Sequence, residues 1–156
     1  MNVEFLAKMG GVMKELRVII AGGRDFDDFP LLMNKCIEII AEETKKDDSL
    51  EKIRIVSGTA RGADKLGEQY AQIAHYDVSR FEANWDYYGK SAGYRRNAEM
   101  AKFASEDGNI GVLIAFWDGK SRGTKHMIDL AKRYGLKVHA VNYEMGEYIN
   151  EENKTD

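Results

Sequence analysis

The sequence predicts a three-layer α/β/α fold, in which a mainly parallel sheet of about five strands is covered by helices on both faces. Two observations support this prediction. Short apolar runs rich in β-branched residues recur without polar alternation, as expected for strands buried on both faces. These runs alternate with segments whose apolar residues recur at helical spacing, and the connections are short. In such sheets ligands bind at the carboxyl ends of the strands.

The first half of the chain contains two strand-and-helix units. Residues 17–21 are mostly apolar and β-branched and form the first expected strand. Pro30 suits the first turn of a helix, which then runs over residues 31–44. Residues 53–56 form the second strand, and the helix after it buries an apolar stripe within residues 66–74. Both strands end at glycine-containing turns.

The second half continues the alternation. Residues 77–82 are expected to form a weaker third strand, and residues 83–92 an irregular aromatic segment. A helix over residues 93–104 follows. The remaining expected elements are a fourth strand at residues 111–116, a helix that ends at Tyr134 and a fifth strand at residues 136–141.

The chain has 156 residues, which is the size of one domain, and 44% of them are hydrophobic. We expect the domain to cover residues 15–145. Residues 1–14 are expected to be a flexible N-terminal extension, and residues 146–156 a frayed polar tail. Cys36 is expected to pack in the core, and a chain with a single cysteine fits a reducing cytoplasm.

The charge balance and hydropathy limit the partners. The formal net charge is −3, so overall charge does not attract duplex nucleic acid, and such binding would need a local basic patch. No apolar run approaches the ~20 residues of a membrane span, and no signal peptide is visible. We therefore expect a cytoplasmic protein that does not engage a membrane.

The most specific site motif follows the fourth strand. There the apolar run stops at Asp118, and a turn with two cations leads into a helix. The free N–H groups and the dipole of a helix N-terminus favour a bound anion. Ser121 and Thr124 suit either a helix cap or a hydrogen bond to phosphate. The candidate ligand-binding residues here are Gly119, Lys120, Ser121, Arg122, Gly123 and Thr124.

The turn after the first strand supplies further candidates. Gly22 and Gly23 let the backbone approach a ligand closely. Arg24 can bind a phosphate or carboxylate as a fork. An equally good interpretation is a tight turn in which Arg24 pairs with Asp27 or Asp28.

The turn after the second strand combines glycines, a cation and a carboxylate. Ser57 or Thr59 suits a helix cap. Asp64 suits a pair of hydroxyl groups such as those of ribose. The alternative for Asp64, favoured when this residue is taken alone, is a helix-dipole partner worth ~0.3–1 kcal/mol. The candidate ligand-binding residues in this turn are Ser57, Gly58, Arg61, Gly62 and Asp64.

Aromatic residues crowd the segment before the third helix. Several tyrosines and a tryptophan lie beside cations there, which suits a base or sugar stacked next to a phosphate. The alternatives are a solvated charged face and aromatic residues that fill the core. The candidate ligand-binding residues here are Trp85, Lys90, Arg96 and Asn97.

Several motifs of known chemistry are absent from the sequence. It has neither the Gly-x-Gly-x-x-Gly of ordinary NAD-binding folds nor the Gly-x-x-x-x-Gly-Lys-Ser/Thr of P-loop NTPases. His75, His126 and His139 do not share ligand spacing with a cysteine or with one another, and no serine nucleophile motif is present. We therefore expect no bound metal and no cofactor.

Five segments in one order resemble the YspA-type branch of the SLOG superfamily. They are residues 17–26, 57–64, 83–93, 96–97 and 119–124. The resemblance runs from about residue 17 to residue 141, which is nearly the whole domain. It implies a Rossmann-like fold and a nucleotide-derived ligand, without a settled reaction. Relatives commonly pair, so the resemblance leaves a homo-oligomer open.

A related family suggests an enzymatic alternative. Lonely Guy phosphoribohydrolases cleave the base from a nucleoside monophosphate, and the chain resembles them at Arg96 and at residues 123–124. It departs from them at Asn97, where they carry lysine. It also departs after Thr124, where they carry a catalytic glutamate and this chain has no carboxylate until Asp129. Glycosidic cleavage needs a carboxylate. If the chain is a hydrolase, Arg96 and Asp64 are the catalytic candidates.

A second relative suggests nucleic-acid binding. The single-strand-DNA-binding protein DprA has a segment similar to residues 57–64, which implies strand binding through the same cationic turns. The acidic net charge argues instead for a small ligand.

We therefore predict that the chain binds a nucleotide or nucleotide-derived phosphorylated ligand at the carboxyl ends of the parallel strands, as a sensor or sequestering module. The phosphate is expected on residues 119–124, with Arg61 and Arg96 neutralising it and Asp64 or Asn97 reading the ribose. Cleavage of nucleoside monophosphates and binding of single-stranded DNA are the alternatives. The sequence does not decide whether the chain is an enzyme.

Overall fold

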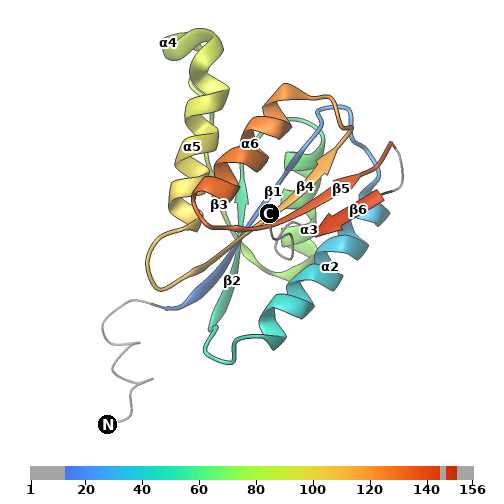
Figure 1. Cartoon of the computed structure of the whole chain (residues 1–156), viewed down its shortest axis with the longest axis vertical. Coiled ribbons are helices and arrows are strands. Elements are labelled where there is room, and N and C mark those ends of the chain that lie inside the picture. The colour runs from blue at the N-terminus through green and yellow to red at the C-terminus, as the bar shows by residue number, and fades with distance from the viewer. Residues whose placement is uncertain (1–12, 145–146, 151–156) are drawn as a thin grey trace.

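The computed structural model describes residues 13–144 and 147–150, and its sheet has six strands in the order β3-β2-β1-β4-β5-β6 (Figure 1). The strands are β1 Glu15–Gly22, β2 Lys52–Ser57, β3 Asp77–Arg80, β4 Ile110–Trp117, β5 Lys137–Asn142 and β6 Glu147–Asn150. The helices are α2 Phe29–Lys45, α3 Ala63–Ala74, α4 Trp85–Tyr88, α5 Ala92–Ala104 and α6 Arg122–Arg133, with a short 3-10 turn, η1, at Gly89–Ser91. Strands β1 to β5 are parallel, and β6 is antiparallel to β5. The predicted Rossmann-like fold with a mainly parallel sheet is confirmed.

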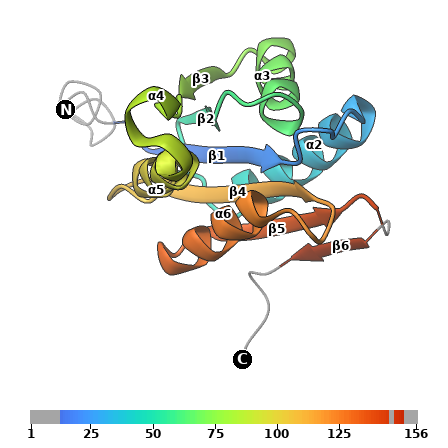
Figure 2. The same cartoon turned by 90° about the horizontal axis from the view of Figure 1, so that it is seen from above.

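Helices cover both faces of the sheet (Figure 2). Helices α2 and α3 pack on one face, where Leu32 and Cys36 share a core with Ile20 of β1. Helices α5 and α6 pack on the other face, where Met100 shares a core with Ile19. Neighbouring residues of β1 therefore face opposite apolar layers, which explains why the strand shows no polar alternation. Cys36 is fully buried, as predicted.

The strand order changes direction between β1 and β4. From β1 the chain proceeds to β2 and β3 on one side, then returns to place β4 and β5 on the other. The segments that leave the carboxyl ends of β1 and β4 lead to helices on opposite faces, so a crevice opens between them. Gly22 is opposite Phe116 in register, and the N–H of Gly23 donates to the Phe116 carbonyl at 3.0 Å. These contacts join the two strands at the bottom of the crevice.

The aromatic segment at residues 83–92 is more regular than predicted. It contains α4, which begins where the Asn84 side chain accepts a hydrogen bond from the Tyr87 N–H at 3.1 Å. This is an ordinary N-cap, and the aromatic composition of the segment concealed it. Helix α4 lies beyond the start of α5, outside the sheet layers (Figure 1).

The C-terminal segment also differs from its prediction. Residues 147–150, expected within a polar tail, form β6 at the edge of the sheet. Backbone hydrogen bonds make this pairing, so it needs no apolar pattern in the sequence. The predicted flexible extension and the rest of the tail lie mostly outside the described residues. No helix within the described residues is long and apolar enough to cross a membrane.

Candidate functional site

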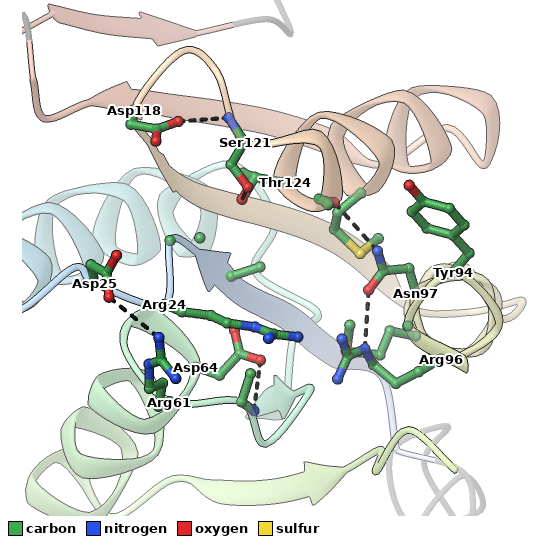
Figure 3. Close-up of a pocket in the computed structure, with 18 of the residues that line it drawn as sticks. Arg24, Asp25, Arg61, Asp64, Tyr94, Arg96, Asn97, Asp118, Ser121 and Thr124 are labelled. Carbon is green, nitrogen blue, oxygen red and sulfur yellow. Dashed lines mark hydrogen bonds and ion pairs between the residues drawn. The ribbon is translucent and has the colours of Figure 1, made fainter. Parts of the chain in front are cut away.

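A cavity of about 470 Å³ lies at the carboxyl ends of the parallel strands (Figure 3). Its walls come from the segments that follow β1, β2 and β4 and from the first turns of α5. The predicted ligand-binding residues that line it are Gly22, Gly23, Arg24, Arg61, Asp64, Trp85, Lys90, Arg96, Asn97, Ser121, Gly123 and Thr124. A second hollow of about 660 Å³ adds Gly58 and shares Arg24, Arg61, Trp85 and Arg96 with the first. The fold thus brings all four predicted segments together.

Five predicted residues line neither hollow: Ser57, Gly62, Gly119, Lys120 and Arg122. The Ser57 hydroxyl donates to Glu68 at 2.6 Å and accepts from the Thr59 N–H at 3.1 Å. It does not cap α3, whose N-cap is Gly62 and which receives no side-chain cap. The expected cap by Ser57 or Thr59 is therefore wrong, because the hydroxyl of Ser57 is engaged by the side chain of Glu68.

Two arginines point toward each other across the cavity. Arg24 reaches in from the segment after β1, and Arg96 from α5 (Figure 3). Arg96 is held in place, since its Nη1 donates to the Gly58 carbonyl and its Nε donates to Asn97 Oδ1 at 3.1 Å. Arg24 lies over Trp85, with its Cζ 5.8 Å from the ring centroid. Two converging guanidinium groups make this part of the cavity suitable for an anion.

Arg24 does not form the local ion pair with Asp27 or Asp28 that was the alternative to ligand binding. No ion pair with Asp27 or Asp28 is present in the described part of the chain. Asp28 has another role, since its carboxylate caps α2 by accepting from the Leu31 N–H at 3.1 Å. The tight turn itself is present, since the Phe26 N–H donates to the Gly23 carbonyl at 3.2 Å, but the pairing of Arg24 with Asp27 or Asp28 is wrong.

Asp64 is a buried carboxyl group at the start of α3. It is 6% exposed, and its Oδ2 accepts from the Ala60 N–H at 3.1 Å. Burial raises the pKa of Asp64 from 3.8 to about 6, and the nearby Arg96 opposes that rise. Asp64 lies in the first turn of α3, as the helix-dipole alternative requires, but its carboxyl group is buried rather than solvated. Asp64 lines the cavity, and its carboxyl group changes charge near pH 6.

Replacing Asp64 with asparagine is expected to stabilise the fold at alkaline pH. The pKa of Asp64 is higher in the folded state than in the unfolded state, so the folded state binds the proton more tightly. The free energy of unfolding therefore falls as pH rises through about 6, where the buried carboxyl group becomes charged. We expect Asp64→Asn to raise the free energy of unfolding by roughly 2 kcal/mol at pH 8, and to have little effect at pH 4. Urea unfolding at both pH values measures this. Asp25→Asn, at an exposed carboxylate, is the matched control, and equal stability of Asp64→Asn and wild type at pH 8 would contradict the prediction.

The turn before α6 offers fewer free N–H groups than predicted. The Asp118 carboxylate accepts from the N–H groups of Lys120 and Ser121 at 2.8 and 2.7 Å, and these bonds lower its pKa. The backbone N–H groups in the first turn of α6 receive no side-chain cap, because Ser121 occupies the N-cap position but its side chain does not accept from them. The candidate anion-binding residues of this segment are therefore reduced to residues 121–124, of which Ser121, Gly123 and Thr124 line the cavity.

A known protein family and a phage protein are similar to this chain. The family described as YspA, cpYpsA-related SLOG matches residues 16–88, which hold the first two glycine turns. The Gene 61 protein of Mycobacterium phage D29 is 31% identical over 127 residues, covering 78% of this chain and 93% of the phage protein. This chain belongs to the YspA, cpYpsA-related SLOG family. No solved structure matches it.

The outer wall of the cavity in this SLOG-family chain carries weakly paired charges. Arg61 Nη2 lies 3.5 Å from Asp25 Oδ1, and both side chains are largely exposed, at 73% and 93%. An exposed ion pair of this kind is worth about 0–1 kcal/mol. Arg61 can therefore exchange its carboxylate partner for a bound anion at little cost.

The aromatic residues of this SLOG-family chain lie at the mouth of the cavity. Trp85 and Tyr94 both line it and are both 47% exposed. They therefore do not fill the core, which was one alternative for this segment. Exposed aromatic rings at the mouth of a cavity can stack on a planar ligand group, and the Trp85 ring lies next to Arg24.

Some lining residues were not predicted. Tyr143 follows β5, packs its ring 4.9 Å from that of Phe26 and lines the cavity. Its position just after a parallel strand was a usable signal. Met100 and Met127 also line the cavity, yet they occupy buried helical positions that a sequence cannot distinguish from ordinary core. Within the described residues, no group of three or more His, Cys, Asp or Glu side chains could hold a metal ion.

Proposed function

We propose that this SLOG-family protein binds a nucleotide or nucleotide-derived phosphorylated ligand in the cavity between β1 and β4. One observation carries the proposal: the guanidinium groups of Arg24 and Arg96 and the uncapped start of α6 face the same cavity. Cationic forks and a free helix N-terminus are both complementary to phosphate. The crevice where a parallel sheet changes direction is also the usual ligand site of such folds.

The lining residues suggest how the rest of the ligand lies. A phosphate at residues 121–124 leaves Asp64 free to accept hydrogen bonds from ribose hydroxyl groups. Asn97 is less suited to that role, because its amide is engaged by protein groups. Trp85 and Tyr94 then stand where a base can stack. The proposed function is therefore to bind this ligand as a sensor or sequestering module, with no reaction assigned.

Calorimetric titration with a panel of nucleoside mono- and diphosphates tests the proposal. We expect the wild type to bind at least one of them, and Gly123→Asp to abolish measurable binding, because a carboxylate at the start of α6 repels the phosphate. Gly123→Ala is the matched control, because no atom lies within 4 Å of its added Cβ. We expect its affinity to stay within about threefold of wild type. Unchanged affinity in Gly123→Asp would contradict the site.

Asp64 favours a second candidate function, cleavage of the glycosidic bond of a nucleoside monophosphate. Its pKa of about 6 suits proton transfer near neutral pH, and Arg96 lies beside it. If Asp64 acts as a general base, the rate at which the nucleobase is released should rise as pH increases through about 6. The same rate should be much lower in Asp64→Asn. Incubation with each monophosphate, followed by chromatography for the free base, measures this. No free base from any of them would count against cleavage.

A further inference from the structure

The side chain of Asn97 has only one amide orientation that fits its neighbours. Asn97 lies on α5 and is 6% exposed. Arg96 Nε lies 3.1 Å from one terminal atom of the Asn97 amide. A guanidinium can only donate, so this atom must be the oxygen Oδ1. The amide nitrogen Nδ2 therefore faces α6, where the Gly123 carbonyl lies at 3.4 Å and His126 Nδ1 at 3.2 Å.

This orientation also determines the protonation of His126. Because Asn97 Nδ2 is a donor, the His126 Nδ1 it meets must carry a lone pair, and the ring proton lies on Nε2. The ring is half-buried and packs on Tyr94, with centroids 4.3 Å apart. A continuous series of hydrogen bonds thus runs from Arg96 through Asn97 to His126, with a branch to the backbone of Gly123.

We infer that neutral His126 is a positioning residue, which fixes Asn97 and through it the Arg96 guanidinium and the start of α6. Protonation of His126 disrupts this arrangement, so anion binding in the cavity is linked to the charge of a histidine outside it. This inference rests on the proposed function, in which Arg96 and the start of α6 hold the anion.

Protonation removes one hydrogen bond whichever way the Asn97 amide turns. A protonated Nδ1 is a donor and opposes the Nδ2 donor of Asn97. If the amide turns over, its Nδ2 instead opposes the Nε–H of Arg96. In the first case the hydrogen bond between Asn97 and His126 is lost, and in the second case the hydrogen bond between Asn97 and Arg96 is lost.

The groups around His126 keep it neutral at pH 7. Two charged residues of α6 act on His126, the cation Arg133 and the anion Asp129. Asp129 is also paired with Lys125 at 3.0 Å. From α5, His126 meets the uncharged ring of Tyr94 and the amide of Asn97. Burial and Arg133 hold the pKa of His126 below its ordinary 6.5, and Asp129 opposes this. The transition therefore falls on the acidic side of neutrality.

A ligand-free measurement tests the positioning contact directly. Nitrogen-15 spectra of the imidazole rings should show His126 protonated on Nε2, with a pKa below 6.5. Asn97→Asp keeps the shape of the side chain but places a carboxylate oxygen against Nδ1, so it should raise the pKa of His126 above 6.5. The imidazole signals of His75, exposed at the end of α3, are the control and should be the same in both proteins. An unchanged pKa of His126 in Asn97→Asp would overturn the inference.

Anion binding provides the second test, with inorganic sulfate as the probe because its charge is constant between pH 5 and pH 7.5. His126→Asn places an acceptor oxygen at the position of Nδ1 and cannot titrate, whereas His126→Leu has no acceptor. From pH 7.5 to pH 5, sulfate affinity of the wild type relative to His126→Asn should fall by about three- to tenfold, as one hydrogen bond is lost. His126→Leu should bind weakly at both pH values. Asp64 titrates in all three proteins, so its effect cancels in the ratio.

The sign of the pH effect separates positioning from simple charge. A positive charge added at His126 would strengthen anion binding, whereas loss of the hydrogen-bond series weakens it. A ratio that stays constant or rises on acidification would therefore overturn the inference. If sulfate and all nucleotides fail to bind at any pH, the proposed function fails, and the ring titration of Asn97→Asp still decides whether His126 positions Asn97.

Discussion

Replacing Gly62 with alanine is expected to lower the free energy of unfolding by about 3–5 kcal/mol. Gly62 has a φ of +82°, and a Cβ built on it would lie 2.3 Å from the Gly23 carbonyl oxygen and 2.6 Å from the carbonyl carbon of Arg24. Both obstacles are backbone atoms, so no side-chain rotation relieves the overlap. The left-handed conformation and the overlap therefore add to one another.

Gly108→Ala is a matched control, because it separates the two contributions. Gly108 has a φ of +86°, yet no atom lies within 4 Å of its added Cβ. Gly108→Ala should lower the free energy of unfolding by about 1–2 kcal/mol, the cost of the left-handed conformation alone. Urea unfolding of both variants measures the difference. If Gly62→Ala is no less stable than Gly108→Ala, the contact between the first two turns does not determine the stability of this region.

The contact at Gly62 also concerns the site, because it joins two segments that line the cavity. The N–H of Ala63 donates to the Gly23 carbonyl at 3.2 Å, so the start of α3 rests directly on the turn that carries Arg24. A side chain at Gly62 would push these turns apart. Gly62 thus supports the predicted site without lining it, which is a role that the sequence motif could not distinguish from ligand contact.

The parts of the site that the sequence could predict are those set by topology. Arg24, Arg61 and Gly123 follow different strands, and parallel strands place their carboxyl ends at one edge of the sheet. The buried strands were predictable from composition, since a run such as Ile19 and Ile20 without polar alternation indicates a strand that is covered on both faces. These inferences need only patterns and chain direction.

The remaining parts depend on distances that no sequence pattern records. Asp64 and Asp118 are both carboxylates beside glycines, yet Asp64 is buried with a raised pKa, whereas Asp118 accepts two backbone N–H groups and has a lowered pKa. Asp118 had a local signal, because aspartate often accepts N–H groups two and three residues ahead. Burial of Asp64, and the contact of Asn97 with His126, arise only when α3, α5 and α6 come together.

Replacing Arg96 with alanine is expected to weaken binding of the best nucleotide ligand by about 1,000-fold, or roughly 4 kcal/mol. The change removes one of the two converging guanidinium groups and leaves Arg24 as the remaining arginine that opposes the raised pKa of Asp64. The pKa of Asp64 should therefore rise further, so a larger fraction of the carboxyl group is neutral at pH 7 and it repels the phosphate less. Loss of the fork remains the dominant effect, because a bidentate contact supplies both charge and geometry. Calorimetric titration measures the loss, and circular dichroism checks that the variant folds.

Arg95 provides the matched control, since it is the neighbouring arginine on the same helix turn. Its Nε donates to Ser91 Oγ at 3.2 Å, its Cζ lies 4.2 Å from the Tyr88 ring centroid, and it lines neither hollow. Arg95→Ala removes the same charge within one residue of Arg96, so it should change affinity by less than about threefold if contact rather than overall charge holds the ligand. Arg96→Lys should fall between the two, because it keeps the charge but not the planar fork. Equal losses in Arg95→Ala and Arg96→Ala would mean that long-range attraction dominates, and unchanged affinity in Arg96→Ala would remove the cavity from consideration as the nucleotide site.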